Sequence, residues 1–196
     1  MDKPQATKDI IVATLPHIPF DGWSMRALTH GAADAGYAKT DVIRVFPSGA
    51  MQAVDAFFAL SDDEMKTTLG RYHLETMKVR AKITLAVKLR IEIHGGHKEA
   101  LRRAVALYML PFNLLRASHS LYRTVDSIWH AIGDTSTDFN FYSKRATLAG
   151  VYASTLHHWL SDESAGTQAT WDFLDRRIED VMQIEKLKQK IRQIIP

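Results

Sequence analysis

The spacing of apolar residues is the feature that most limits what this chain can fold into. Along its 196 residues, apolar side chains recur every three or four positions, and no run of five or more shows clean alternation between turn residues. This period is typical of amphipathic helices and not of half-buried strands. We therefore predict an all-α fold. The expected helices are residues 5–18, 24–33, 39–46, 50–60, 62–94, 98–110, 113–132, 137–160 and 167–194.

Composition excludes several classes of protein. The chain has no cysteine, so it has no disulfide framework, thiolate metal site or cysteine nucleophile. Its longest apolar runs are far shorter than the ~18–20 residues that span a bilayer. The first residues, MDKPQATKD, have neither a signal-peptide core nor an arginine-rich presequence. We expect a cytoplasmic, bacterial protein.

The first four expected helices have the rhythm of a helix-turn-helix. Three short helices, then Phe46-Pro47-Ser48 and a longer helix, resemble the N-terminal part of TetR-type regulators. Residues 1–60, however, hold five basic and six acidic residues, whereas phosphate contacts require an excess of cations. We therefore expect a helix-turn-helix-like subdomain at 1–48 that binds no nucleic acid.

The recognition-like helix, KTDVIRVF, supports the same expectation. Val42, Ile43 and Val45 stand where such regulators usually offer tyrosine and histidine to the DNA backbone. The alternative is a TetR-type DNA-binding transcriptional regulator with a hydrophobic effector.

The stretch GDTSTDFNFYSKRATLAG, residues 133–150, is expected to start a helix after a polar cap. Within that helix, two stripes have apolar members. The first consists of Phe139, Tyr142, Ala146, Ala149, Ala153, Leu156 and Leu160, and the second of Phe141, Arg145, Leu148, Tyr152 and Thr155. Two interpretations stay open: the helix is buried on both sides, or Phe141 and Tyr142 remain exposed as an aromatic anchor for a partner.

Three blocks carry a specific resemblance: MLPFN (109–113), WHAIGDTSTDFNFYSKRATLAGVY (129–152) and WDFLDRRIEDVM (171–182). Together they resemble the ubiquinone-biosynthesis accessory family, that is, the ninth Coq protein and its bacterial relatives, whose fold is similar to that of TetR regulators. The resemblance implies a lipid-binding protein that is not an enzyme and needs no cofactor. It also implies that the protein presents polyprenyl quinone intermediates to the di-iron demethoxyubiquinone hydroxylase.

Carried over by position, the resemblance implies a surface for that hydroxylase. The implied residues are Ile128, Asp138, Phe141, Tyr142 and Arg145. The family often has tryptophan at the position of Phe141. Phenylalanine keeps an aromatic ring there but lacks the indole donor.

The apolar residues of the expected bundle, 49–182, fit either a packed core or a lined pocket. Spacing alone favours the core, whereas the resemblance implies a cavity for an isoprenoid or phospholipid ligand. The expected lining is Ile83, Val87, Leu107, Leu110, Leu114, Leu148, Tyr152, Leu156, Trp159 and Leu174.

The C-terminal tail, 183–196, holds four basic residues and one acidic residue, so its net charge of +3 equals that of the whole chain. Its pattern fits an amphipathic helix on an anionic membrane surface, as the resemblance also implies, or a final bundle helix or dimer contact. The expected membrane-binding residues are Ile184, Leu187, Lys188, Ile191, Arg192, Ile194 and Ile195. The protein would then be peripheral on the bacterial inner membrane, or on the matrix side of the mitochondrial inner membrane if the chain is a trimmed eukaryotic one.

Catalytic and metal-binding patterns are missing. The repeated Glu-x-x-His motif of di-iron bundles does not occur, and His157 and His158, as helix neighbours, point about 100° apart. We expect no metal and no enzymatic activity. A homodimer is compatible with both the accessory protein and the regulator.

Overall fold

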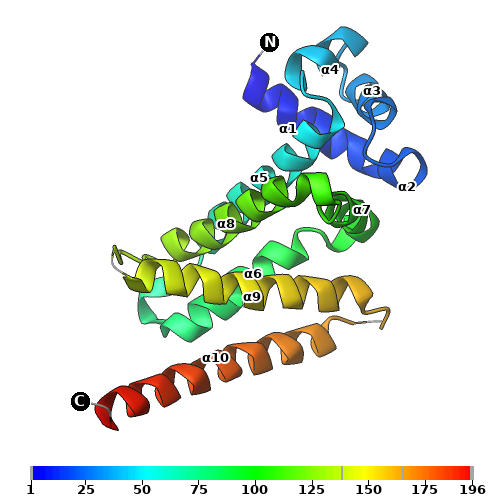
Figure 1. The fold of residues 1–196 in the computed structure, drawn as a ribbon. Helices are drawn as coiled ribbons and strands as arrows, with labels where there is room; N and C mark the ends of the chain where they lie inside the picture. The colour runs from blue at the N-terminus through cyan, green and yellow to red at the C-terminus, as the bar shows by residue number, and fades with distance from the viewer. Residues whose placement is uncertain (1, 138, 165, 195–196) are drawn as a thin grey trace. The chain divides into compact units, whose positions relative to one another are not determined.

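The computed structural model describes residues 2–137, 139–164 and 166–194, with only the backbone described for 139–140 and 184–194. Every regular element in these ranges is a helix, so the all-α prediction is confirmed (Figure 1). The α-helices are α1 (Lys3–Thr14), α2 (Ile18–Asp21), α3 (Met25–Asp34), α4 (Lys39–Val45), α5 (Ala50–Leu69), α6 (Val79–Glu92), α7 (Lys98–Tyr108), α8 (Leu114–Ala131), α9 (Phe139–Ser161) and α10 (Gln168–Ile194). Short 3-10 helices are η1 (Leu15–His17), η2 (Leu74–Thr76), η3 (Gly95–His97) and η4 (Pro111–Asn113).

Two predicted helices have wrong boundaries: 50–60 ends too early, and 62–94 begins too early, because α6 starts only at Val79. The expected break at residue 61 does not occur, because α5 is continuous from Ala50 to Leu69. Ser61 satisfies its hydroxyl inside the helix by donating to the carbonyl of Phe57 at 2.8 Å. The chain leaves the helix at Gly70 instead, and the segment between α5 and α6 contains the short helix η2.

The structure divides the chain into two compact units, each built from two segments. Unit 1 comprises residues 1–65 and 92–120, and unit 2 comprises residues 66–91 and 121–196. The segments predicted from the sequence, 1–48, 49–182 and 183–196, follow chain order and do not coincide with these units. Their functional assignment stays a prediction.

Unit 1 is held together by the packing of α1 on α3 and by a cluster of aromatic side chains. The indole of Trp23 donates to the carbonyl of Ala100 at 2.9 Å, and its ring lies 5.1 Å from that of Phe57. Phe58 stacks on Tyr108 at 5.0 Å, and the Tyr108 hydroxyl donates to Asp55 at 2.8 Å. These contacts join α5 and α7 to the N-terminal helices, which explains why unit 1 extends beyond residue 48.

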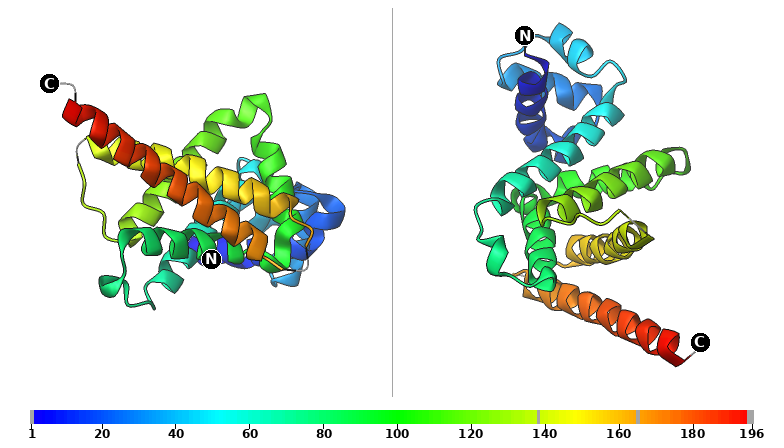
Figure 2. Two further views of the ribbon diagram at one scale, coloured as in Figure 1. Left: turned by 90° about the horizontal axis from the view of Figure 1, so that it is seen from below. Right: turned by 90° about the vertical axis from the view of Figure 1, so that its left-hand side faces the viewer.

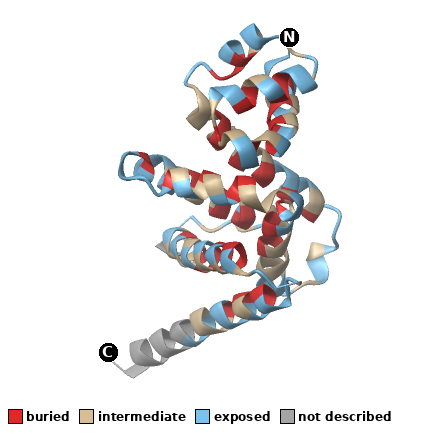
Figure 3. Cartoon of the chain, turned by 90° about the vertical axis from the view of Figure 1, so that its right-hand side faces the viewer, coloured by how far each residue is buried: buried red, intermediate tan, exposed pale blue. Residues whose placement is uncertain are grey.

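Unit 2 contains α6, most of α8, α9 and α10. α9 and α10 lie side by side, as the views in Figures 1 and 2 agree. The helices of this unit bury one side and expose the other (Figure 3). The buried apolar residues of unit 2 are Leu69, Ala86, Val87, Ile91, Val125, Ile128, Trp129, Ile132, Leu148, Val151, Tyr152, Leu156, Trp159, Leu160, Trp171, Leu174 and Ile178.

Candidate functional site: an apolar pocket and the start of α9

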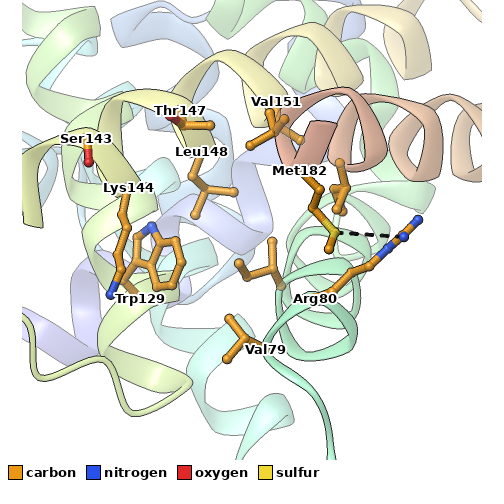
Figure 4. A pocket seen from close by; sticks show the side chains of 12 residues that line it. Val79, Arg80, Trp129, Ser143, Lys144, Thr147, Leu148, Val151 and Met182 are labelled. Carbon is orange, nitrogen blue, oxygen red and sulfur yellow. Dashed lines mark hydrogen bonds between the residues drawn. The ribbon is translucent and has the colours of Figure 1, made fainter. Parts of the chain in front are cut away.

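Unit 2 contains a pocket of about 420 Å³ with mostly apolar walls (Figure 4). Each of its four helices contributes at least one side chain. The lining residues are Val79, Arg80 and Ile83 of α6, Trp129 of α8, Ser143, Lys144, Thr147, Leu148 and Val151 of α9, and Ile178, Val181 and Met182 of α10. This volume lies within the ~300–1,000 Å³ typical of small-molecule pockets.

Cationic side chains lie at both ends of the pocket. Figure 4 shows Lys144 beside Trp129 on one side, and Arg80 beside Met182 on the other. Lys144 Nζ is 5.3 Å from the centre of the Trp129 ring. Arg80 Nη1 lies 2.5 Å from Glu179 and 3.9 Å from the sulfur of Met182. Both cations are therefore held in place, and the apolar wall lies between them.

Each of these cations is paired with a carboxylate, which limits the kind of ligand that the pocket can hold. Lys144 Nζ donates to Asp134 at 2.7 Å, and Arg80 is paired with Glu179. The pocket therefore has polar donors at its ends without a strong excess of positive charge. In addition, the buried indole Nε1 of Trp129 has no hydrogen-bond partner among the described residues.

The structure brings together only part of the predicted lipid-binding set. Ile83 and Leu148 line the pocket. Five others do not line it and lie buried in unit 2: Val87, Tyr152, Leu156, Trp159 and Leu174. The remaining three belong to unit 1, where Leu107 is half-buried and Leu110 and Leu114 are exposed.

Several lining residues were not predicted, although a simple signal points to them. Val79 precedes Ile83 by four residues, and Ile178 and Met182 follow Leu174 by four and eight. Helical residues separated by four share a face, so extending the predicted stripes by one turn finds Val79 and Ile178, and a second turn finds Met182. Lys144 and Thr147, by contrast, are polar, so the spacing of apolar residues cannot identify them as lining residues.

A buried polar network holds the start of α9. Arg145 is 2% exposed, and its Nε donates to Asp126 at 2.6 Å while its Nη1 lies 3.5 Å from Asp134. Nη1 also donates to the Phe141 carbonyl at 3.2 Å. The third nitrogen, Nη2, is buried with no hydrogen-bond partner among the described residues. Arg145 thus ties α9 to α8 and to the turn before α9.

Asp134 is the anionic centre of this network. Burial acts to raise the pKa of Asp134, but hydrogen bonds from Lys144 and from Ser136, at 2.7 Å each, outweigh it and bring the pKa below its ordinary value. The carboxylate therefore stays ionised at neutral pH, which keeps both cations paired.

The two aromatics at the start of α9 differ in exposure. Tyr142 is 67% exposed, whereas Phe141 is half-buried beneath the Arg145 guanidinium, whose carbon is 3.4 Å from the ring centre. The two rings meet edge to face at 5.1 Å. Farther along, α9 buries Arg145, Leu148, Tyr152 and Thr155 and exposes Ala146 and Ala153. The second predicted stripe is thus the main buried one.

Two members of the predicted partner surface do not lie on the surface. Ile128 is fully buried and Arg145 nearly so. Their side chains support the start of α9 from within, because Ile128 belongs to the core of unit 2 and Arg145 is enclosed by carboxylates and Phe141. Asp138 lies outside the described residues.

The predicted membrane-binding residues of the tail also lie outside the described side chains. These are Ile184, Leu187, Lys188, Ile191, Arg192, Ile194 and Ile195. In the part of the chain that the structure describes, no helix is both long and apolar enough to cross a bilayer.

Of the two adjacent histidines noted in the sequence, His157 is exposed and only His158 packs against an aromatic ring; His94 does so as well. His94 lies 4.9 Å from Phe57, and His158 stacks on Phe173 at 4.5 Å. Among the described residues, no group of three or more histidine or acidic side chains is arranged to hold a metal ion.

The arrangement of the helices defines the class of fold. The chain is similar to a crystal structure of the TetR transcriptional regulator from Nitrosomonas europaea, with a TM-score of 0.71 and 18% identity, covering 88% of this chain and 95% of that one. Likeness at this identity shows the fold alone, and the predicted TetR-like fold is confirmed.

Comparison of the sequence with known proteins adds a likeness to one family. Residues 114–185 match the model of the COQ9 family. Similar proteins include the mitochondrial ubiquinone biosynthesis protein COQ9 of Rattus norvegicus, 30% identical over 192 residues that cover 93% of this chain and 61% of that protein. The Homo sapiens COQ9 is 29% identical, covering 93% and 59%. Xenopus laevis COQ9-B is 31% identical, covering 91% and 63%.

The predicted resemblance to the ninth Coq protein of ubiquinone biosynthesis is therefore confirmed, and it extends over most of the chain. The chain spans about three fifths of the length of these relatives.

Proposed function

We propose that this protein takes part in ubiquinone biosynthesis as a lipid-binding accessory protein that acts without catalysing a reaction. It holds the ring and the adjoining chain of a polyprenyl quinone intermediate in the pocket of unit 2. The observation that carries the proposal is this apolar pocket, built largely by the segment that matches the COQ9 family. The assignment to ubiquinone biosynthesis rests on the names of the similar proteins.

The chemistry of the pocket suits a neutral amphiphile. Its apolar walls match an isoprenoid chain, and the paired cations favour neutral ring oxygens over a phosphate. Lys144 has three N–H donors, of which the contacts to Asp134 and Ser136 use two, so one remains for a ring oxygen.

Delivery requires a partner surface, and the start of α9 fits that role. Tyr142 projects into solvent beside Phe141, and aromatic side chains often anchor protein interfaces. We assign Phe141 and Tyr142 to direct contact with the membrane-associated di-iron demethoxyubiquinone hydroxylase. Arg145 acts as a positioning residue beneath them.

Lipid carriage also implies contact with a bilayer. The proposal keeps the tail as an amphipathic helix on the inner membrane, mitochondrial if the chain has the location of its relatives, and keeps a homodimer as the assembly. The membrane-bound tail and the homodimer extend the proposal, but the binding of cargo in the pocket requires neither of them.

The pocket is tested by filling it. Ile83→Trp places a larger ring in the lining, whereas Leu89→Trp makes the same change on the same helix at a position that does not line the pocket. Both variants and the parent chain are purified, extracted with organic solvent and analysed by mass spectrometry. We expect quinone or quinone-like isoprenoid in the parent and in Leu89→Trp, and at least about a tenfold loss in Ile83→Trp.

An empty extract from the parent, repeated after incubation with quinone-bearing vesicles, would contradict the proposal. Salt-dependent binding to promoter DNA by the same empty protein would instead support the regulator alternative.

A further inference from the structure

The turn between α7 and α8 exposes apolar side chains and buries a polar one. Phe112 is 80% exposed and Leu115 is 86% exposed, whereas the polar residue between them, Asn113, is buried. Soluble proteins seldom gather large apolar side chains at one exposed turn unless that surface has a partner. We call this group the apolar tip: Met109, Leu110, Phe112, Leu114 and Leu115.

The apolar tip is held in this arrangement by hydrogen bonds. The Asn113 side-chain amide donates to the carbonyl of Leu107 at 2.9 Å, and its backbone N–H donates to that of Leu110 at 2.8 Å. The carbonyl of Val105 accepts from Met109 at 3.0 Å. The buried asparagine satisfies the backbone of the turn from within, so the apolar side chains are left pointing outward.

The charge around the apolar tip identifies its partner. Residues 97–120, the part of this segment in unit 1, contain four basic residues and one acidic residue, Glu99, and no charged residue occurs between Arg103 and Arg116. Arg102 and Arg103 share Glu99, and Arg116 pairs with Asp55, so the basic residues here still outnumber the acidic ones by two. An uncharged apolar segment with cations on both sides complements a bilayer that carries negative phospholipids at its surface and acyl chains beneath.

We infer that the apolar tip is a membrane-docking site in unit 1 that inserts Phe112 and Leu115 among the acyl chains of an anionic bilayer. This site is separate from the tail, which belongs to unit 2. The inference extends the proposed function by naming a second contact with the membrane, and its test has readouts that do not depend on cargo.

Insertion is measured directly with a fluorescent residue at the apolar tip. All four native tryptophans, Trp23, Trp129, Trp159 and Trp171, are buried, so Phe112→Trp adds an exposed one. Vesicles of phosphatidylcholine with phosphatidylglycerol are added to the full chain. We expect a blue shift of the Phe112→Trp emission and quenching by brominated acyl chains, neither of which the parent chain shows.

The contribution to binding is measured by vesicle flotation. Phe112→Ser/Leu115→Ser is compared with Phe20→Ser/Ile43→Ser, which removes one exposed aromatic and one exposed aliphatic residue elsewhere in unit 1. Withdrawing two inserted side chains should weaken partitioning by about 30-fold or more. The control pair should change it by less than about twofold.

Three results would overturn the inference. One is equal partitioning of the two double variants; another is an unshifted Phe112→Trp emission on vesicles. The third is a monomer–dimer equilibrium, without vesicles, that Phe112→Ser/Leu115→Ser abolishes, because the apolar tip would then meet a second copy of the chain. The two proposals can fail separately. If Ile83→Trp loses its cargo but still floats with vesicles as the parent chain does, the membrane-docking inference stands. If the protein carries its cargo but flotation does not depend on Phe112 and Leu115, the proposed function stands.

Discussion

At the scale of single residues, the start of α9 depends on charges that the structure encloses. Arg145 and Lys144 converge on Asp134, and Arg145 also meets Asp126. Removing one partner of a buried ion pair leaves the other charge unpaired, which costs more than the pair contributes in isolation. These residues therefore fix the position of Phe141, although Arg145, at 2% exposed, cannot itself reach a partner.

Asp134 makes this network sensitive to pH. Its pKa is lower in the folded chain than in the unfolded one, because the hydrogen bonds from Lys144 and Ser136 exceed the opposing effect of burial. The resulting stability is fully present above the unfolded pKa of about 3.9 and is lost as the pH falls through the lower folded pKa. We expect Asp134→Asn to lower the free energy of unfolding by about 1–3 kcal/mol at pH 7 and by much less near pH 2.

Urea unfolding at the two pH values measures this difference. Asp175→Asn, which removes an exposed carboxylate of unit 2, serves as the control and should change the free energy of unfolding little at either pH. An equal loss at pH 7 and pH 2 in Asp134→Asn would mean that the carboxylate charge is not what stabilises the turn.

At the scale of elements, α1 and α3 approach so closely that one position admits only glycine. A Cβ at Gly31 would overlap the side chain and backbone of Thr14, and Gly31 is buried in α3. The hydroxyl of Thr14 is already engaged, donating to the carbonyl of Ile10 at 2.6 Å. Gly31 and Thr14 cannot move apart unless the packing of α1 on α3, the main contact of unit 1, opens.

We expect Gly31→Ala to destabilise the fold by about 1–3 kcal/mol through overpacking. Gly150 provides a matched control, because it lies within α9 and a Cβ there would meet nothing within 4 Å. Gly150→Ala should raise stability by about 0.5–1 kcal/mol, since it lowers the entropy of the unfolded chain without a clash. Thermal melts of both variants would show opposite shifts, and shifts of the same sign would contradict this account of the α1–α3 contact.

At the scale of the whole molecule, the proposed cargo site lies in one unit only. Every lining residue of the pocket belongs to unit 2, whereas the helix-turn-helix-like helices α3 and α4 belong to unit 1. In α4, Val42 and Val45 are core residues and only Ile43 of the three predicted valine and isoleucine positions is exposed. The first two therefore do not stand on a surface where DNA contacts would form.

A ligand in the pocket should slow hydrogen exchange in unit 2. With a short-chain ubiquinone as the probe, we expect added protection in α6, α9 and α10 and none in α3 or α4, because ligand binding stabilises the state that holds it. Hydrogen–deuterium exchange with mass spectrometry measures this, and Ile83→Trp should abolish the protection. Protection centred on α3 and α4 would place the ligand elsewhere.

The sequence by itself determined the helical class, nearly all the helices and the resemblance that implied an isoprenoid ligand. It could do so because helical periodicity and turn residues such as Gly133, whose φ is +86°, act over a few neighbouring positions. Family-like sequence blocks such as WDFLDRRIEDVM can likewise be recognised from consecutive residues alone.

Only the tertiary structure decided which helix faces are buried, which line the pocket and which are exposed to solvent. Leu148 and Leu156 lie on the same helix, yet the first lines the pocket and the second is buried away from its lining. Phe112 is exposed, whereas the cation Arg145 is enclosed. Periodicity identifies which residues share a face, but whether that face meets a helix, a pocket or water depends on side chains distant in the sequence.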